Sequence, residues 1–505
     1  MPEIKNTFLK SKMNKDLDDR LISSGEYRDA QNITISKSED SDVGAIENIL
    51  GNIIKTDFGL SANCNLETIG YYSDVVNDRL FVFLTDYVDT SVDYLSNHSF
   101  DTNAHSYICV YNINTGFYNT LVTGSFLNFS TTHPITGVNL LEDLLFWTDN
   151  RNQPRKINVD IAINDDTYYS KEEHISVAKY YPYEPIDLFK TGFVSLKPIT
   201  LGDTSSMRDV VSDKLPDGTT NNPHRDDDWK GDSNYLRDKY VRFSYRFRFE
   251  DGEYSLIAPF TQIAFIPEQD GYFLDDNMLI ADLEEGKAGN ADLRKTYKST
   301  ILSFMRNKVN DISLMIPPPS NSRGAGTWAV AYDDFKITEI DILYKESDGL
   351  AIQVIDTIKN EIDPFADATI DSVHKTLEYI YNSQRPYKTL PDFETIRVND
   401  VVPVKALSQE IVGNRVVYGN FIDKHTPPKF INFTAATAKK GGLETTPITS
   451  TIRKEYQNHT LKQNRSYQVG IVLSDLYGRQ SDVILSSSVD KSTIYHPYKT
   501  GGTYP

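Results

Sequence analysis

The chain has little cysteine, no long apolar run and no excess of positive charge, and each shortage excludes a class of protein. Its 505 residues include two cysteines, Cys64 and Cys109, too few for a disulfide framework or a four-cysteine zinc site. No run of about 18 apolar residues occurs, so no membrane-spanning helix is expected. The N-terminal residues Met-Pro-Glu-Ile-Lys-Asn-Thr lack the apolar core of a secretory signal. With 71 acidic and 52 basic residues the formal net charge is −19, which argues against a dedicated, nonspecific binder of duplex DNA.

Motifs of common enzymes are missing as well. The sequence has no Gly-x-Ser-x-Gly, no Walker loop, no His-Glu-x-x-His and no Gly-x-Gly-x-x-Gly after a strand. The histidines are scattered, for example at His105, His133 and His374, and the acidic stretch Asp226–Asp228 lacks the spacing of a calcium loop. We therefore predict a protein that is not an enzyme and holds no cofactor or metal.

Aromatic residues are abundant, and they point to β structure. The chain has 31 Tyr and 24 Phe but only 6 Met. Tyr and Phe suit the half-buried surface of a pleated sheet. Short apolar runs alternate with clusters of the turn-forming residues Asn, Asp, Gly and Pro, which is typical of an all-β protein.

Residues 61–190 repeat one pattern: a strand, a tight polar turn, and a second strand that ends in small polar residues. The expected strands cover 69–72, 80–84, 107–111, 135–140, 144–147 and 156–159. The pattern returns at 411–420, within the segment 391–440. Successive antiparallel strands of this kind build β-propeller blades, so we predict an interrupted propeller. A generic meander sheet is the alternative.

The segment 191–390 between these blades shows a different pattern. Residues 241–249 alternate between five apolar side chains and polar ones, which places the apolar set on one face of a strand. Gly252-x-x-Ser255 follows this strand, and Gly478-x-x-Ser481 occupies the same place in the segment 441–505. These strands resemble those of fibronectin-type β-sandwiches, so we expect an inserted sandwich-like platform and a second sandwich-like hairpin. The chain ends at Pro505 without the expected last sheet partners, which favours a fragment of a longer protein.

One amphipathic helix is expected at about 290–309. Asn290 or Asp292 can cap it, and apolar residues recur at three- to four-residue spacing as far as Val309. We expect its apolar stripe to pack on a sheet or on a neighbouring subunit.

Arg242, Arg246 and Arg248 lie on the polar side of the strand 241–249. Three guanidinium groups on one strand face could bind carboxylates of a partner or phosphates of nucleic acid. They are our candidate partner-contact residues. The alternative is a face that pairs with acids on adjacent strands.

Residues 1–60 read as an extended N-terminal arm with short strands, and they carry a resemblance. The stretches Lys5–Leu21, Gly25–Asn32 and Gly44–Asn48 resemble the N-terminus of tail nozzle proteins of short-tailed bacteriophages, also called hub, muzzle or "stabilisation" proteins. The stretch 134–150, which contains Phe146-Trp147-Thr148-Asp149, is similar to propeller blades of the same proteins and to the Tyr-Trp-Thr-Asp propellers of receptor ectodomains.

The resemblance implies a structural virion protein of a bacteriophage tail. It implies a homo-oligomeric ring, a hexamer, below the portal and adaptor, assembled in the host cytoplasm. Such a ring retains the packaged genome and forms the channel for DNA ejection, and tail fibres or spikes dock on its flank. Net negative charge suits a conduit that passes DNA without specific binding. The alternatives are a collar or baseplate component of another tail type, or a glycan-binding or glycan-hydrolysing β-propeller.

Overall fold

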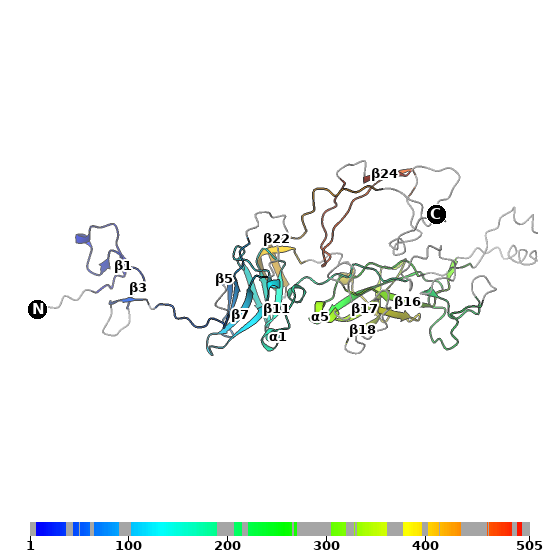
Figure 1. Ribbon diagram of the computed structural model, residues 1–505, viewed down its shortest axis with the longest axis horizontal. Helices are drawn as coiled ribbons and strands as arrows, with labels where there is room; N and C mark the ends of the chain where they lie inside the picture. Colours follow the sequence, from blue (N-terminus) through cyan, green and yellow to red (C-terminus); the bar gives the residue numbers. More distant parts are fainter. Residues whose placement is uncertain are drawn as a thin grey trace, which may run out of the picture. The chain divides into compact units, whose positions relative to one another are not determined.

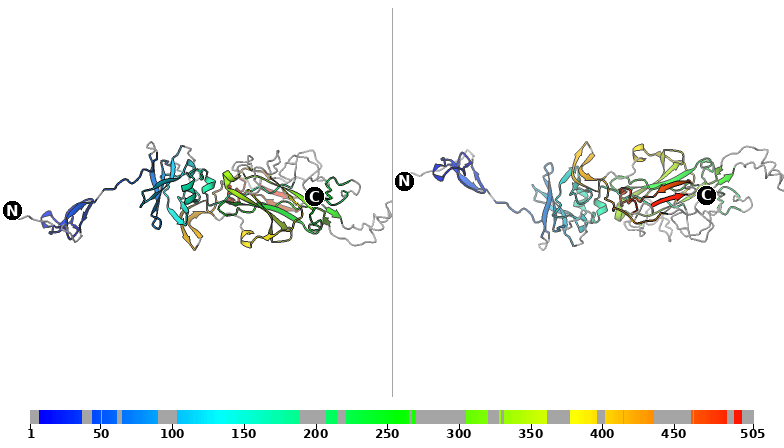
Figure 2. Two further views of the ribbon diagram at one scale, coloured as in Figure 1. Left: turned by 90° about the horizontal axis from the view of Figure 1, so that it is seen from below. Right: turned by 90° about the horizontal axis from the view of Figure 1, so that it is seen from above.

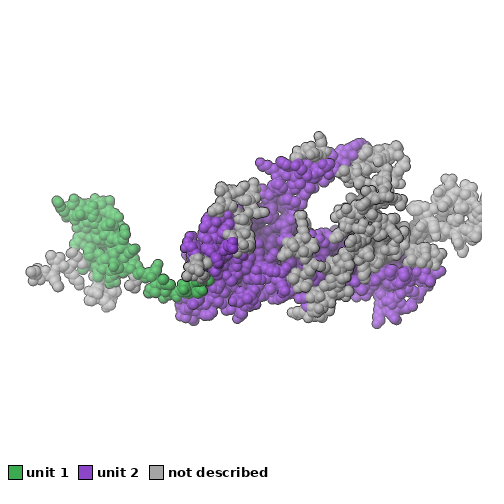
Figure 3. Space-filling view, in the orientation of Figure 1, with its two compact units in different colours: residues 1–62 green, residues 63–505 purple. Residues whose placement is uncertain are grey.

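A computed structural model divides the chain into two compact units, residues 1–62 and residues 63–505 (Figure 3). The structure describes residues 7–36, 44–49, 51–60, 65–89, 103–188, 207–214, 221–264, 267–269, 305–319, 328, 331–360, 377–395, 402–413, 415–435, 462, 464–486 and 492–496. Strands far outnumber helices among these residues (Figure 1), which confirms the prediction of a mainly β protein.

The first unit consists of short strands without an apolar core. Its elements are β1 (Lys12–Met13) paired in parallel with β2 (Glu26–Tyr27), β3 (Ile33–Ile35) paired antiparallel with β4 (Ile46–Asn48), and the 3-10 turn η1 (Asp19–Leu21). Asp18 caps η1 by accepting a hydrogen bond from Arg20 N at 3.1 Å. No apolar side chain is buried in the part of this unit that the structure describes.

The second unit begins with a four-stranded antiparallel meander. Its strands in order are β5 (Glu67–Asp74), β6 (Arg79–Thr85), β7 (Ser106–Asn112) and β8 (Tyr118–Thr123), followed by the 3-10 turn η2 (Ser125–Leu127). The first turn is specified by Asp74, whose Oδ1 accepts hydrogen bonds from Val76 N at 3.2 Å and Asn77 N at 3.3 Å. The polar turn predicted between strands is therefore a side-chain-capped Asx turn.

A three-stranded sheet follows, and short helices succeed it. Its strands are β9 (Gly137–Leu141), β10 (Leu144–Thr148) and β11 (Arg155–Asn158), and the helices are α1 (Val159–Asn164) and α2 (Glu172–Ile175). Asp149 caps the turn after β10 as Asp74 does after β5, because its Oδ1 accepts hydrogen bonds from Arg151 N at 2.9 Å and Asn152 N at 2.7 Å. The same turn structure thus recurs at two different places of the strand pattern, between β5 and β6 and at the exit after β10.

These two sheets share one core. Its centre is aromatic: the ring centroids of Phe83 and Phe129 lie 6.0 Å apart, and those of Phe83 and Trp147 lie 5.8 Å apart. Gly70 of β5 lies close to Ile135, so a Cβ atom at Gly70 would stand 2.6 Å from the Cβ of Ile135. The sequence therefore uses glycine where β5 meets the segment that leads into β9.

A hairpin from far along the chain lies beside β9. It consists of β21 (Lys405–Val412) and β22 (Arg415–Ile422). Asn139 Nδ2 of β9 donates to Glu410 Oε1 at 3.3 Å, and Asn150 N donates to Ala406 O at 3.0 Å. A side-chain bond to β9 and a single main-chain bond to the turn after β10, rather than a regular ladder, join this hairpin to the sheet. None of the sheets that the structure describes closes on itself.

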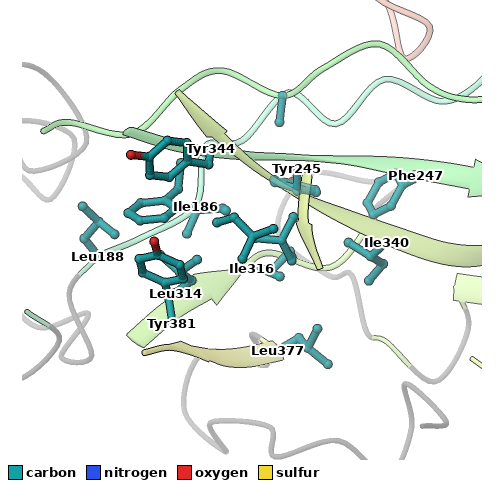
Figure 4. Packing of buried hydrophobic residues seen from close by; sticks show 14 of the residues in the cluster. Ile186, Leu188, Tyr245, Phe247, Leu314, Ile316, Ile340, Tyr344, Leu377 and Tyr381 are labelled. Carbon is teal, nitrogen blue, oxygen red and sulfur yellow. The ribbon is translucent and has the colours of Figure 1, made fainter. Parts of the chain in front are cut away.

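Two further sheets pack face to face across the larger of the two main apolar cores that the described residues form (Figure 4). One contains β13 (Val241–Phe249), β17 (Ile337–Glu346), β18 (Ile352–Lys359) and β20 (Lys388–Thr389), and the other contains β12 (Met207–Arg208), β16 (Asp311–Ile316) and β19 (Leu377–Tyr381). The long strands β13 and β17 run side by side in both views of Figure 2. All five apolar residues of β13 are buried in this core, as their alternation predicts.

The remaining elements are short. They are β14 (Pro267–Gln269), which pairs with β15 (Met305–Asn307), the helices α5 (Ala331–Phe335) and α6 (Asp392–Thr395), and β23 (Arg465–Gln468), which pairs with β24 (Thr493–His496). The helix expected at about 290–309 does not reach residue 309, because residues 305–307 form β15 and Val309 is buried outside any helix. The rest of that expected helix lies outside the described residues.

Candidate functional site: arginine stripe, polar joint and exposed strands

Arg246, the middle residue of the predicted arginine stripe, is buried and paired within the chain. Its side chain is 2% exposed, and its Nε lies 2.9 Å from Asp341 Oδ2 on the neighbouring strand β17. Its Nη1 lies 2.5 Å from Glu394 Oε2 in α6, and its guanidinium carbon is 3.8 Å from the ring centroid of Tyr254. Register explains the first contact, because Arg246 stands directly opposite Asp341 in the ladder.

The flanking arginines lie on the same side of β13 but differ from Arg246 in exposure. Arg248 is 39% exposed, and its Nη1 lies 3.0 Å from Glu339 Oε2, its ladder partner on β17. The hydrogen bond that Arg248 donates to Glu339 raises the pKa of the guanidinium. Arg242 is half-buried and stands opposite Lys345. The structure thus brings the three arginines onto one strand face, with acids of β17 opposite two of them.

A second polar cluster, here called the polar joint, connects strand β11 and the segment after α2 with the turn after β13. Lys156 Nζ lies 3.1 Å from Asp251 Oδ2 and 2.9 Å from Glu253 Oε1. Lys179 Nζ lies 2.5 Å from the same Asp251 oxygen. Both lysine side chains are nearly buried, at 11% and 12% exposed.

The charges of the polar joint shift one another's protonation. Burial alone would raise the pKa of Asp251, but Lys179 and Lys156 together lower it to about 2. Burial lowers the pKa of Lys179, and the nearby charge of Lys156 lowers it further. For Lys156, burial is outweighed by Glu253 and Asp251, which raise its pKa. Asp251 is therefore charged at all ordinary pH values and holds two cations in a largely buried place.

The joint continues to helix α5. Lys171 forms an ion pair with Asp334, and the Tyr168 hydroxyl donates a hydrogen bond to Glu250 Oε2. His174 Nε2 lies 2.7 Å from Asp333 O, and Ser170 N donates to His174 Nδ1 at 3.4 Å. Burial lowers the pKa of His174, which favours the neutral ring near pH 7, and Tyr168 O also lies 3.1 Å from its Nδ1.

A cavity of about 390 Å³ lies within this joint. Lys156, Lys179, Tyr168, Glu173 and His174 are among its lining residues. Burial raises the pKa of Glu173. Among the residues that the structure describes, no group of three or more His, Cys, Asp or Glu side chains could hold a metal ion. Most charged side chains of the cavity wall make contacts between chain segments. The cavity lining is therefore suited to holding these segments together.

Several exposed apolar side chains lie on the hairpin β21–β22. Val412 is 60% exposed, Val417 52% and Phe421 53%, and β22 pairs with no other described strand on its outer edge. Exposed apolar residues on an unpaired strand are a common sign of an interface with another chain.

Sequence reasoning found the arginine stripe but missed the polar joint and the apolar hairpin. Residues 250–253 carry only a turn signal, and nothing local shows that Lys156 and Lys179 meet them. The pattern at 411–420 predicts two strands joined by a turn, as the hairpin has them, but alternation does not tell which of their apolar residues stay exposed.

These features are those of a structural protein with surfaces for assembly. The profile of the crassvirus muzzle protein family matches residues 4–310, more than half of the chain, and the chain therefore belongs to that family. It is a structural protein of a viral tail and a member of an oligomeric, tail-associated assembly. No curated protein matches the chain. No helix in the described part of the chain is long and apolar enough to cross a membrane.

Proposed function

We propose that this chain is a subunit of a tail nozzle ring, a hexamer that forms the DNA-ejection channel and helps to retain the packaged genome. The observation that carries this proposal is the family match over residues 4–310, which includes the arm and both blade-like sheets. The partners are the portal and adaptor above the ring and fibres or spikes on its flank, and the ring assembles in the host cytoplasm before it joins the virion.

The proposal includes a β-propeller in which a hairpin from late in the chain adds to a blade formed by earlier strands. A four-stranded meander, β5 to β8, and the sheet β9 to β11 with the hairpin β21–β22 beside it have the form of two successive blades. The face-to-face sheets between them supply the platform.

Charge supports the role of a conduit. The chain carries 71 acids against 52 bases, and acids facing a channel repel DNA within a Debye length of about 8–10 Å. DNA then passes without specific binding. A collar or baseplate position, or a glycan-active propeller, remains the alternative to this function.

Electron microscopy and mass photometry of the purified chain test the proposal. The expected result is a closed ring of six copies that does not bind free labelled duplex DNA at physiological salt. A monomer that binds or cleaves glycans would overturn it.

The arginine stripe is a second, separable part of the proposal. Arg248 and Arg242 are partly exposed and can contact a partner, whereas Arg246 is buried and forms ion pairs with Asp341 and Glu394. Changing Arg242 and Arg248 to Gln should weaken docking of a tail partner and leave the ring intact. Unchanged docking would exclude a contact role for the stripe.

A further inference from the structure

The described residues of the N-terminal unit expose apolar side chains and bury none of them in a core. Its strands are two or three residues long, and its sheets have two strands each. Sheets of this size are marginally stable in water unless a further strand or an apolar surface covers them. Most of its large apolar side chains are well exposed among the described residues: Leu9, Met13, Leu17, Leu21, Ile46, Ile49, Ile53 and Ile54. The unit therefore needs another surface to bury them.

The segment 51–60 of this unit is the part best suited to add to a sheet. It is described without helix or strand pairing, and Ile53 and Ile54 are 75% and 88% exposed. Lys55 and Asp57 follow with exposed side chains. Branched aliphatic residues flanked by opposite charges give this segment both strand propensity and a charge pattern for register.

The outer edge of β22 has exposed apolar and charged side chains that complement those of segment 51–60. Val417 and Phe421 are exposed along it, and Arg415 is exposed at its start. Glu410 stands opposite Val417 in the hairpin ladder and is exposed as well. Consider a strand that pairs antiparallel with this edge so that Asp57 lies opposite Arg415. Lys55 then lies opposite Val417. Glu410 lies on the far side of Val417, on β21, within reach of the long Lys55 side chain. Each charge of the segment would then meet an opposite charge.

We propose that residues 53–57 of one copy add as an antiparallel strand to the outer edge of β22 in a second copy of this chain. The inference rests on the proposed ring, because identical copies then supply one donor segment and one acceptor edge each. Donor and acceptor are different surfaces, so the contact is head-to-tail, and head-to-tail contacts form a ring when the rotation between successive copies closes. Main-chain hydrogen bonds would supply affinity, and the two charge pairs would set the register.

Disulfide trapping between differently tagged chains tests the contact. One full-length chain carries Asp57→Cys and the other carries Arg415→Cys, both in a Cys64→Ser background. Cys109 is retained because it is buried and its pKa is raised to about 11, which leaves it unreactive. Mild oxidation of the mixture should give about tenfold more mixed-tag dimer than the control pair Asp57→Cys with Leu350→Cys, because docking raises the local concentration of the two thiols.

A charge exchange tests the register. Asp57→Lys or Arg415→Glu alone should weaken assembly about two- to fivefold, as expected for an exposed ion pair. Combining both changes in one chain should restore assembly. Failure of the combined variant to recover, with each single variant impaired, would overturn the antiparallel register.

The outcomes separate this inference from the proposed function. Rings without the mixed-tag dimer would overturn the strand addition and leave the nozzle ring standing. Cross-links that form only within one chain carrying both cysteines would show that the arm docks on its own copy, which also overturns the proposal. Mixed-tag dimers without rings would support the contact and contradict the ring.

Discussion

Ser255 and Ser481 occupy the same position in two hairpins far apart in the sequence and make the same hydrogen bonds. Ser255 Oγ accepts from Phe247 N at 2.9 Å, and Ser481 Oγ accepts from Leu473 N at 3.1 Å. Each hydroxyl also donates to the carbonyl of the next residue, at 2.8 Å to Leu256 O and 2.9 Å to Asp482 O. The glycines that precede them, Gly252 and Gly478, both have φ of +81°, which favours glycine.

The two serines should nevertheless differ in their contribution to stability. Ser255→Ala leaves the buried Phe247 N–H without its partner and should cost about 1–3 kcal/mol of unfolding free energy. Ser481→Ala should cost less than Ser255→Ala, about 1 kcal/mol, because the hydrogen bond from Leu473 N is only partly buried whereas that from Phe247 N is buried. Denaturant unfolding followed by tryptophan fluorescence measures both. Equal losses would contradict the role of burial.

Gly70 should tolerate no side chain. A Cβ there would stand 2.6 Å from the Cβ of Ile135, so Gly70→Ala should lower stability by about 1–3 kcal/mol. Gly349→Ala is the matched control, because a Cβ at Gly349 meets its nearest neighbour at 3.5 Å. Adding Ile135→Gly to Gly70→Ala removes the overlapping Cβ of residue 135, so the double variant should lose less than the sum of the two single losses. Full additivity would mean that the overlap is not the cause.

Arg246 should be the most costly of the three arginines to remove. Arg246→Met leaves Asp341 buried without its cation, and breaking such a pair costs about 3–5 kcal/mol. Arg248→Met, at a half-exposed pair, should cost less than about 1 kcal/mol. Chemical denaturation compares the two variants. Arg246→Met combined with Asp341→Asn should recover part of the loss, and no recovery would exclude an electrostatic cause.

The polar joint should weaken in acid. The folded-state pKa of Asp251 is about 2, below its ordinary value of 3.8, so its contribution is fully present above pH 4. It is lost as the pH falls from about 4 to 2, and it amounts to at most about 2 kcal/mol. Asp251→Asn should therefore be less stable than the unaltered chain at pH 7, with the difference shrinking toward pH 2. A constant difference across this range would contradict the predicted linkage.

Strand positions could be predicted from the sequence because they depend on local alternation. The apolar residues of 241–249 fill the core between two sheets, and the turns at Asp74 and Asp149 end strands where expected. The helix at 290–309 illustrates the limit, since residues 305–307 pair with 267–269 instead. A stripe of apolar residues indicates what is buried, but partner strands decide the backbone conformation.

The candidate site depended more on contacts between distant segments. The stripe of arginines could be read from one strand, but the acids opposite Arg246 and Arg248 follow from the register of β13 with β17. The polar joint joins Lys156 and Lys179 to Asp251, and only the tertiary fold brings these residues together.

The position of β21 beside β9 has a consequence for biosynthesis. Asn139 and Glu410, which join these strands, are separated by 271 residues. At roughly 5–20 residues per second, a ribosome needs about 14–54 s to translate that distance. During this interval β9 has been made and the hairpin that lies along it has not. The nascent chain must keep that strand from pairing with other polypeptides until the late hairpin arrives.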